Sequence, residues 1–431
     1  MTSVAEVEYR AKEPWQSLTP TKVVRVALAG CGAVGSALLR ELVARRDAIA
    51  LRYGVEFVLT RVLVRDVDRR RDATFDRGLL TNDVDEFLAT GADVVVEAIG
   101  GLEPALRIAE SALGRGRQLV TANKLLLAAH GSSLAARARA NDTTLRYDAA
   151  VGGGVPILRL LDESLGAGGP ARVRGILNGT ANFVLSHIEN GASFDEALDE
   201  ARAAGFAEAD ASRDLDGRDA ADKIALIAWT AFGIAPEALF VRRVSLLPAP
   251  QQFVRLASRL GARVRQVAEC ALVSDCVVAS VEPLLVAPES ALARTHHEGN
   301  HVDVFAGWRA PLSASGPGAG GLPTATALLS DLVSTSGVPR RGVGVCVSTD
   351  GVRASRWAIE VRAEPSALHR TVPQCGLVHT DDTASTSWTI IESATPLQID
   401  ALVAALHSAG ASPIAARIDD AAAQNGEETL Q

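Results

Sequence analysis

Mostly apolar runs of strand length alternate with helix-like segments over the first third of the chain. The runs are bounded by glycine or polar residues, and a stretch with helical spacing of apolar positions, Ser36 to Arg46, follows the first of them. Strands that are apolar on both faces are typical of a parallel sheet covered by helices. We therefore predict an α/β domain at residues 22–150, with strands at 23–29, 57–64, 93–98 and 118–121.

The spacing of apolar positions changes after residue 150. Alternating segments predict strands and helical spacing predicts helices, in an arrangement typical of a mixed sheet. The predicted strands are 173–177, 263–267 and 276–281, and the predicted helices are 183–189 and 194–203. We interpret residues 151–325 as a second α/β domain, followed by a return helix and linker at 326–340.

A third region begins near residue 341. Its segments predict a small α+β module at 341–420, with strands at 357–362, 388–393 and 413–418 and a helix at 396–409. The two ends of the chain differ from these units, and we expect a flexible arm at 1–21 and a polar tail at 421–431.

Composition narrows the class of protein. Of 431 residues 43 are basic and 51 acidic, so the net charge of −8 argues against nucleic acid or an anionic membrane as partner. No apolar run approaches the roughly 18 residues of a membrane span, and the N-terminus lacks the apolar core of a signal peptide. The five cysteines are scattered without metal or redox spacing, so we expect free thiols in the cytoplasm.

The first predicted strand runs into Gly30-Cys31-Gly32-Ala33-Val34-Gly35 and then into a helix. This is the G-x-G-x-x-G pattern in the strand–turn–helix context that dinucleotide binding requires. Gly30 permits the tight turn, Gly32 lets the backbone approach a pyrophosphate, and Gly35 allows close packing of helix on strand. The helix N-terminus supplies amide donors. The alternative is a glycine-rich turn in another α/β fold.

The second predicted strand ends in Arg65 and Asp66. In a dinucleotide-binding domain the residue at that strand end meets the adenosine ribose. An acid there favours NAD, whereas an arginine favours the 2′-phosphate of NADP. Because Arg65 comes first, we favour NADP over NAD. The alternative is a surface ion pair between the two residues.

Ile99 and Gly100 follow the third strand, and Lys124 follows the fourth. Ligands of open parallel sheets bind beyond such strand ends. We therefore expect Lys124 beside the nicotinamide half of the cofactor. The alternative is a solvent-facing lysine at the start of a helix.

An acidic segment, AEADASRDLDGRDAADK at 207–223, leads into an apolar helix. It contains Asp219 and Lys223, which share one helix face because they are four residues apart. The chain has only four lysines (Lys12, Lys22, Lys124 and Lys223), and lysine, unlike arginine, can release a proton when burial lowers its pKa. We predict that Lys223 handles a proton or binds substrate. The alternative is a solvated helix start, capped by Asp214 or Asp216, with an exposed ion pair.

The segment YDAAVGGGVP, at 147–156, leaves the first domain. Three consecutive glycines are unfavourable inside a helix or strand, so the backbone is expected to come close to a ligand or an ion. Backbone carbonyls and the Asp148 carboxylate could hold a hard cation. A flexible hinge is the alternative. A second glycine-rich loop, at 316–321, leads into another helix.

Seven segments together resemble homoserine dehydrogenase and occur in the order typical of that family. They are ALAGCGAVG, VVVEAIGG, VTANKLLLA, YDAAVGGGVP, GILNGTANFVL, AEADASRDLDGRDAADK and GAGGLPTATALLSDL. The likeness covers about residues 22–335. It implies a Rossmann-type domain, a second catalytic and dimerisation domain, and NAD(P)-dependent interconversion of aspartate 4-semialdehyde and homoserine. That reaction lies on the route to threonine, isoleucine and methionine.

The resemblance also implies roles for individual residues. Lys223 matches the proton donor to the carbonyl oxygen, and Lys124 matches a second active-site lysine that also meets the cofactor. The other matched residues are acids that hold the substrate (Glu208, Asp214, Asp219), a loop beside it (Asn178, Gly179, Thr180) and a glycine that touches the cofactor (Gly320).

A sodium site is implied in the same way. Val151, Gly153 and Val155 match the residues whose backbone carbonyls bind the ion in the family. The family usually has glutamate where this chain has Asp148, so the carboxylate here is one methylene shorter. Arg265 also stands where lysine is common.

Many family members carry an ACT regulatory domain after this part. The order of strands and helix at 341–420 fits that module loosely, although the segment AEPSAL lacks the glycine expected in the ligand turn. Threonine feedback is left open, and a module that only supports assembly is the alternative. We expect a homodimer, or a larger homo-oligomer, formed through the second domain.

Two other functions fit the same architecture. One is another amino-acid dehydrogenase, and the other is an amino-acid sensor that has lost turnover. Retention of both site lysines and of the three matched carboxylates argues against the sensor.

Overall fold

The computed structural model describes most of the chain as helices, strands and the loops between them. The described residues are 22–69, 71, 75–164, 169–307, 311–338, 355–361, 379–381, 386–394, 396–408, 411 and 413–417. The predicted arm at 1–21, the segment AEPSAL and the predicted tail at 421–431 lie outside them. Two compact units are distinguished: residues 15–343 form the larger one, and the C-terminal module belongs to the other.

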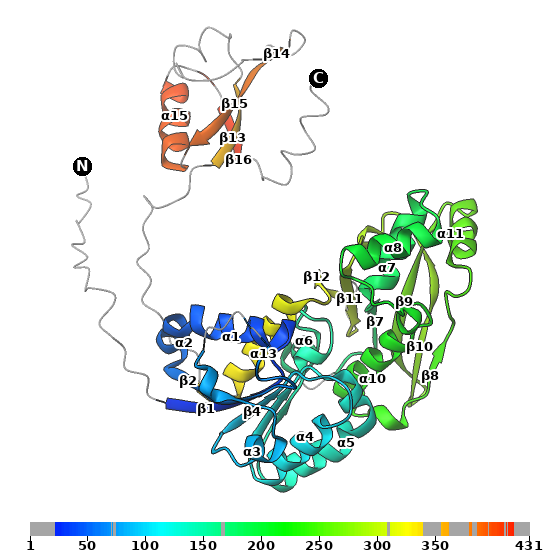
Figure 1. Ribbon diagram of the computed structural model, residues 1–431. Coiled ribbons are helices and arrows are strands. Elements are labelled where there is room, and N and C mark those ends of the chain that lie inside the picture. The colour runs from blue at the N-terminus through cyan, green and yellow to red at the C-terminus, as the bar shows by residue number, and fades with distance from the viewer. Residues whose placement is uncertain are drawn as a thin grey trace, which may run out of the picture. The chain divides into compact units, whose positions relative to one another are not determined.

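A six-stranded parallel sheet forms the first domain (Figure 1), in the order β3-β2-β1-β4-β5-β6. The strands are β1 (Lys22–Ala29), β2 (Val55–Leu63), β3 (Leu80–Thr81), β4 (Val94–Glu97), β5 (Gln118–Thr121) and β6 (Leu145–Arg146). The strand order reverses beside β1, which is the arrangement of a Rossmann-type domain. The fold class predicted from the apolar runs is confirmed.

Helices cover both faces of this sheet. They are α1 (Ala33–Ala44), α2 (Arg46–Tyr53), α3 (Val84–Leu88), α4 (Ala105–Gly114) and α5 (Lys124–Ala140). On one face Leu38 of α1 packs in a common cluster with Leu328 of α13 (Gly321–Thr335). On the other face Ile108 of α4 packs with Leu126 of α5. The helix α13, which comes from the far end of the larger unit, therefore completes the core of the first domain.

The first helix begins earlier than the apolar spacing predicted. It starts at Ala33 rather than Ser36, and ends at Ala44, where α2 follows almost at once. The reason is that the glycine motif already forms the first turn, because the Ser36 N–H donates to the Gly32 carbonyl at 2.9 Å. The motif is therefore part of the helix N-terminus.

The second domain is built on a six-stranded mixed sheet in the order β12-β11-β7-β9-β10-β8. The strands are β7 (Arg172–Ile176), β8 (Val241–Arg243), β9 (Arg263–Val273), β10 (Cys276–Val286), β11 (Gly299–Phe305) and β12 (Leu312–Pro317). The helices are α6 (Ile157–Ser164), α7 (Gly179–Glu189), α8 (Phe194–Ala203), α9 (Ser212–Leu215), α10 (Arg218–Phe232), α11 (Pro250–Arg259) and α12 (Ala291–Arg294). Ile224 and Ile227 of α10 pack on Ala268 of β9 and Val281 of β10. The apolar helix predicted after the acidic segment therefore packs its isoleucines against the sheet.

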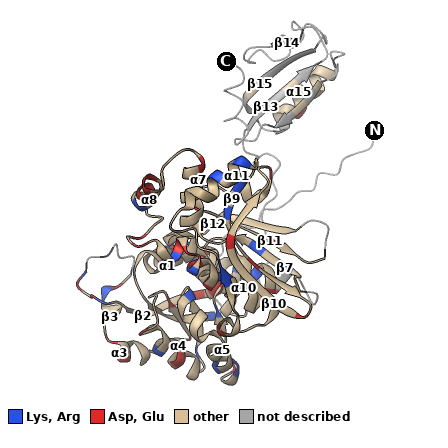
Figure 2. Cartoon of the chain, turned by 90° about the vertical axis from the view of Figure 1, so that its right-hand side faces the viewer, with Lys and Arg blue, Asp and Glu red and all other residues tan. Residues whose placement is uncertain are grey.

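The helix α8 illustrates how the polar residues are placed. Ser193 caps it, and Glu196 completes a reciprocal capping box. Ala197 and Ala201 are buried, while the acidic and basic residues of the helix lie on its other side (Figure 2). Over the residues that the structure describes, no helix has the length and apolar character needed to cross a membrane.

The described part of the C-terminal module contains a four-stranded antiparallel sheet and a helix. Its strands lie in the order β14-β15-β13-β16, and α15 is the helix. The bounds are β13 (Ser355–Val361), β14 (His379–Asp381), β15 (Thr386–Ala394), α15 (Pro396–Ser408) and β16 (Pro413–Arg417). Ile359 of β13 packs with Ile399 and Leu406 of α15. The described part is therefore the α+β unit that the sequence predicted.

Candidate active site

The centre of the site is an ion pair on α10. The Lys223 Nζ atom lies 2.8 Å from Oδ2 of Asp219 and also donates to the Leu177 carbonyl at 2.7 Å. Lys223 is 8% exposed and Asp219 6%. The alternative of a solvated helix start is therefore wrong for these two residues, because the pair is buried where α10 meets the end of β7.

The other oxygen of Asp219 pairs with a lysine from the first domain. Lys124 is the first residue of α5, and its Nζ forms an ion pair with Oδ1 of Asp219. Although burial opposes ionisation, the ammonium groups of Lys223 and Lys124 hold the pKa of Asp219 well below its usual range. Burial likewise lowers the pKa of Lys124, but Asp219 outweighs it and the net pKa is raised. One carboxylate therefore joins two ammonium groups across the two domains.

Asn178 lies between two carboxylates. It is the N-cap of α7, where its Oδ1 accepts from the Ala181 N–H at 2.7 Å. Its Nδ2 donates to Oδ1 of Asp214 at 2.7 Å and to Oδ2 of Asp219 at 2.8 Å. Burial raises the pKa of Asp214, and the hydrogen bond from Asn178 partly offsets that effect. The amide therefore uses both of its hydrogens to keep two acids together.

The capping arrangement differs from the one that the sequence offered. Gly217, at φ 81°, is the N-cap of α10 and provides no side chain, and Asp214 lies in the separate short helix α9. Asp216 instead accepts from the Arg218 N–H at 3.0 Å. The acidic segment is therefore broken by a left-handed glycine turn, which directs Asp214 inward toward Asn178.

The neighbouring predicted residues are close but differ in exposure. The Thr180 hydroxyl donates to the Phe206 carbonyl at 2.5 Å, which ties α7 to the loop 204–211. Gly179 lies against the backbone of Glu298, where a Cβ would approach the carbonyl oxygen to 2.8 Å. Glu208 is exposed on the same loop and forms no hydrogen bond or ion pair with the described residues. The structure does not bring Glu208 together with Asp214 and Asp219.

A cavity of about 290 Å³ joins the two domains in front of these lysines. It is lined by Val34, Ala98, Ile99, Gly100, Ala122, Asn123, Lys124, Ala149, Ala150, Gly152, Gly153, Lys223, Gly318, Ala319 and Thr324. Gly30 has φ 100°, and a Cβ there would lie 2.5 Å from the Ala98 carbonyl oxygen. Open space lies over Gly32, whereas a Cβ at Gly35 would lie 2.0 Å from the Gly30 carbonyl oxygen. Gly30 therefore fits the tight turn, Gly32 the close approach of a pyrophosphate, and Gly35 the packing of helix on strand that dinucleotide binding requires.

Gly320 lies between residues that line the same cavity, although it is not itself a lining residue. It is the N-cap of α13 with φ 115°, and its neighbours Gly318 and Ala319 line the cavity wall. A Cβ at the next residue, Gly321, would lie 3.0 Å from the Ala33 carbonyl oxygen. The two glycine-rich loops are therefore in direct contact, although they are far apart in the sequence.

Arg65 and Asp66 follow β2 as predicted. Both are exposed. One oxygen of Asp66, Oδ1, accepts from the N–H groups of Asp68 at 2.9 Å and Arg69 at 3.1 Å. The Asp66 carboxylate is thus engaged by its own loop, while the Arg65 guanidinium faces solvent at the strand end.

Sequence reasoning missed Glu97, the last residue of β4. Its side chain is fully buried, and Oε1 accepts from the N–H groups of Ile99 at 2.9 Å and Gly100 at 3.2 Å. Its other oxygen accepts from the Thr121 hydroxyl, and Asn123 Nδ2 lies 3.4 Å from Oε1. An acid that closes an otherwise apolar strand, VVVE, is the signal that could have found it.

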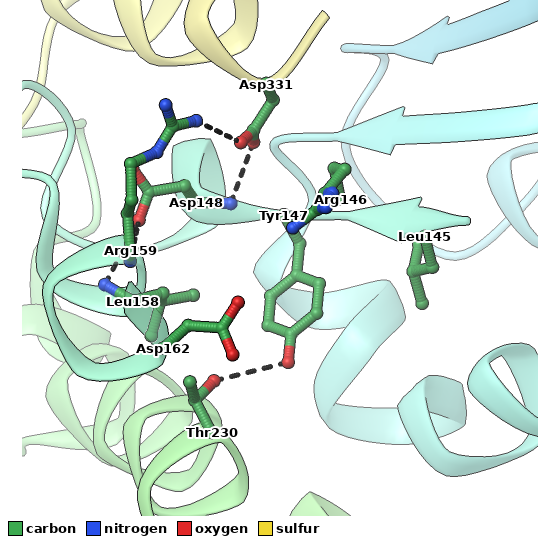
Figure 3. Close-up of a pocket in the computed structure, with 9 residues that line it drawn as sticks. All are labelled: Leu145, Arg146, Tyr147, Asp148, Leu158, Arg159, Asp162, Thr230 and Asp331. Atoms are coloured by element: carbon green, nitrogen blue, oxygen red, sulfur yellow. Dashed lines mark hydrogen bonds and ion pairs between the residues drawn. The ribbon is translucent and has the colours of Figure 1, made fainter. Parts of the chain in front are cut away.

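A second pocket of about 270 Å³ lies on the other side of the loop 147–156 (Figure 3). Within it the Tyr147 hydroxyl is 3.3 Å from the Thr230 hydroxyl, and Oδ2 of Asp331 accepts from the Asp148 N–H at 2.9 Å. Arg159 pairs with Asp331 at 3.2 Å. Burial, together with the nearby Asp148, raises the pKa of Asp331 to about 6. The contacts of Tyr147 and Asp148 in this pocket thus fix the loop 147–156, which forms one wall of the first cavity.

Two of the candidate cation donors, Asp148 and Val155, accept hydrogen bonds from neighbouring backbone N–H groups. Oδ1 of Asp148 accepts from the N–H groups of Leu158 at 3.1 Å and Arg159 at 3.2 Å, so it caps α6. The Val155 carbonyl accepts from the Ile157 N–H at 2.8 Å. Among the described residues, no group of three or more His, Cys, Asp or Glu side chains could hold a metal ion. A cation here would therefore have to use the backbone carbonyls of Val151, Gly153 and Val155.

Comparison with known proteins gives one consistent result. A family model described as homoserine dehydrogenase, NAD binding domain, matches residues 30–148, and one described as homoserine dehydrogenase matches residues 156–333. The homoserine dehydrogenase of Bacillus subtilis is 34% identical over 324 residues, 75% of each chain, and that of Mycobacterium tuberculosis is 38% identical over 319 residues, 72% of each. A solved homoserine dehydrogenase from Thiobacillus denitrificans matches with a TM-score of 0.69 and 28% identity, over 92% of this chain and 98% of that one.

Proposed function

This chain belongs to the homoserine dehydrogenase family, and from that premise we propose how its residues carry out the reaction. As a homoserine dehydrogenase it is an NAD(P)-dependent oxidoreductase that interconverts L-aspartate 4-semialdehyde and L-homoserine. The relatives give no support to another amino-acid dehydrogenase or to an inactive sensor. The observation that carries the residue assignments is the Asp219 carboxylate shared by Lys223 and Lys124.

Lys223 protonates the substrate oxygen in aldehyde reduction and takes the proton back in alcohol oxidation. The hydride itself is carried by the nicotinamide of the bound cofactor. An aldehyde that becomes an alcohol needs a positioned acid, and Lys223 lines the cavity with its ammonium group fixed by Asp219 and the Leu177 carbonyl. Lys124, which pairs with the same Asp219 carboxylate, adds a second positive charge that stabilises the developing alkoxide.

The substrate ammonium group binds to Asp219, which is buried, and to Asp214, which is half-buried. Asp214 and Asp219 are held together by Asn178, so an incoming cation finds two carboxylate oxygens at one place. Glu208 joins them when the loop 204–211 moves inward with the substrate. The link from Thr180 to Phe206 is the fixed end of that loop, and Gly179 keeps the start of α7 close to the backbone of Glu298.

The cofactor lies between the two glycine-rich loops and prefers NADP. Gly30, Gly32 and Gly35, with the start of α1 at Ala33 and Val34, bind the pyrophosphate. Ile99, Gly100, Lys124 and Gly320 enclose the nicotinamide half. Support for NADP comes from the exposed Arg65 at the end of β2, whose neighbour Asp66 is engaged by its own loop.

A sodium ion is held by the backbone carbonyls of Val151, Gly153 and Val155. Asp148 then acts indirectly, since its Oδ1 caps α6 and so fixes the loop that carries those carbonyls. Activity measured in sodium and in potassium salts at equal ionic strength tests this. A rate that depends on the cation supports the site, and equal rates exclude a catalytic need for sodium.

The protein works as a homodimer or larger homo-oligomer of the second domain, in the cytoplasm. Exposed apolar residues near the turn between β9 and β10 support the assembly, among them Leu272 and Val273 of β9 and Val278 of β10. The C-terminal module is an ACT-like unit that regulates or supports that assembly. Light scattering on the full chain gives the mass, and a monomer would contradict the proposal.

The reaction is tested by initial rates with homoserine and either NADP⁺ or NAD⁺, with and without threonine. We expect turnover with both cofactors and a preference for NADP⁺. Folded protein that turns over with neither cofactor would contradict the function, and a preference for NAD⁺ would overturn the role of Arg65. Inhibition by threonine would give the C-terminal module a regulatory role.

A further inference from the structure

A buried carboxylate stands directly behind the cavity wall that is formed by residues 98–101 and by the start of α5. Glu97 ends β4, and its oxygens bind the N–H groups of Ile99 and Gly100 and the hydroxyl of Thr121 on the adjacent strand. The residues that it holds, Ile99 and Gly100, line the cavity themselves. The side chain therefore shapes the wall without reaching the cavity.

The same network continues to the catalytic lysine pair. The Thr121 hydroxyl accepts from the Asn123 N–H at 3.0 Å, and Asn123 Nδ2 donates to the Gly101 carbonyl at 2.7 Å. Asn123 also caps α5, whose first residue is Lys124. The Glu97 carboxylate thus links the loop 98–101 to the residue that pairs with Asp219.

Glu97 has no positive partner in the part of the chain that the structure describes. Its neighbours are two backbone N–H groups, an amide and a hydroxyl, all of which can donate, so the set suits an ionised carboxylate. A buried charge without a counter-ion acts strongly on charges nearby, because little water screens it. The oxidised nicotinamide ring carries a positive charge, and the reduced ring does not.

We propose that Glu97 is a positioning residue for hydride transfer, which fixes the loop 98–101 and the start of α5 and whose negative charge favours the oxidised over the reduced nicotinamide. The proposal rests on the position given above to the nicotinamide half of the cofactor. It makes Glu97 a determinant of the balance between the two directions of the reaction, and not of substrate recognition.

The test compares the affinities of the full chain for NADP⁺ and NADPH in two variants. Glu97→Gln removes the charge but keeps the contacts, because its carbonyl accepts the three N–H groups and its amide donates to Thr121. Thr121→Val keeps the charge and removes the two hydrogen bonds of the Thr121 hydroxyl, to Glu97 and from the Asn123 N–H. NADPH binding is followed by its fluorescence, and NADP⁺ by competition.

We expect Glu97→Gln to weaken NADP⁺ binding by about tenfold and NADPH binding by less than about twofold, the scale of one unit charge acting over about 12 Å at an effective dielectric constant of about 20. Thr121→Val should change both affinities by the same factor. Equal changes for the two forms in Glu97→Gln, or none, would overturn the proposal. If Glu97→Gln does not fold, Glu97→Asn serves the same comparison, because it also removes the charge and keeps an amide group at this position.

The unaltered protein separates this inference from the proposed function. Failure of the unaltered protein to bind either dinucleotide contradicts the function itself. Binding of both dinucleotides by the unaltered protein, with an unchanged NADP⁺ to NADPH ratio in Glu97→Gln, overturns only the role of Glu97.

Discussion

The Lys223 ammonium lies 2.8 Å from the Asp219 carboxylate, one helical turn earlier on α10, and both side chains are almost excluded from solvent. Because the other Asp219 oxygen pairs with Lys124, the position of Lys223 depends on contacts from both domains. A proton donor held in this way needs little reorganisation when charge develops on the substrate oxygen.

Replacing Lys223 should impair the chemical step more than binding. We expect Lys223→Met to lower kcat by about 100-fold or more, the scale of losing general-acid help, with little change in the affinity for NADPH. Initial rates and a fluorescence titration measure the two effects. The matched control is Lys22→Met, since Lys22 donates to the Ser336 carbonyl at 2.6 Å, outside the site. A near-normal kcat in Lys223→Met would remove Lys223 from the proposed role.

Asn178 should affect both substrate binding and stability. Without its amide, Asp214 and Asp219 repel each other, so we expect Asn178→Ala to raise the KM for homoserine by about tenfold, as for loss of hydrogen bonds to charged groups. Loss of the α7 cap should lower the free energy of unfolding by about 1 kcal/mol. Ser193→Ala, which removes the cap of α8, is the control and should lower stability without changing KM. If both variants have the same KM as the unaltered protein, Asn178 is only a helix cap.

Arg65 should discriminate between the two cofactors. We expect Arg65→Ala to weaken NADPH by about tenfold or more, because a charge-assisted hydrogen bond to the 2′-phosphate is lost, and to leave NADH nearly unchanged. Arg107, exposed on α4 and paired with Asp85, offers a control in Arg107→Ala. An equal loss for NADPH and NADH would contradict the preference for NADP.

The buried carboxyl of Asp331 should make stability depend on pH. Its pKa is raised by burial to about 6, above the value near 4 of an unfolded aspartate. The native state therefore holds the proton more tightly, and the free energy of unfolding falls as pH rises from about 4 to about 6. The amide in Asp331→Asn cannot ionise. We therefore expect the difference in free energy of unfolding between this variant and the unaltered protein to shift in favour of the variant by about 2–3 kcal/mol from pH 4 to pH 7.

Asp303 serves as the control for this prediction, because its pKa is shifted in the opposite direction. Burial opposes ionisation of Asp303, but hydrogen bonds from His301 and Ser313 outweigh it and lower its pKa to about 2. The Asp303 carboxylate therefore contributes to the free energy of unfolding above about pH 4, and this contribution is lost as pH falls toward 2. The loss of stability caused by Asp303→Asn should therefore be largest at neutral pH and smaller as pH falls toward 2. Denaturant unfolding at several pH values measures both variants, and parallel curves for Asp331→Asn and the unaltered protein would refute the role of Asp331.

Local spacing predicted the part of the site that lies within one element. Asp219 and Lys223 share a helix face because they are four residues apart, and the structure brings them into contact. Spacing cannot predict contacts between domains, which is why the pairing of Lys124 with Asp219 had no sequence signal. The family resemblance, and not the spacing, grouped Glu208 with Asp214 and Asp219, whereas in the structure Glu208 is exposed on the loop 204–211.

The strands of the second sheet show a similar limit. The strand β7 and the helix α8 were found close to their observed bounds, since their apolar positions follow the expected period. The strand β11 was missed because His301 and Asp303 occupy buried positions in it. These residues bind each other and the serines of β12, with 2.8 Å between His301 Nε2 and Oδ1 of Asp303. In the sequence, the polar residues of such a buried hydrogen-bond network cannot be distinguished from solvent-exposed residues.

The helix α13 has a consequence for how the chain is made. Its residues Ala325, Leu328 and Leu332 are buried against the first sheet, in a cluster with Val26 and Leu38. A ribosome delivers residues in order, so the nucleotide-binding core stays incomplete until the whole second domain has been synthesised. A fragment that stops at residue 150 would leave part of that core uncovered. The two domains are therefore separate in architecture but must mature together.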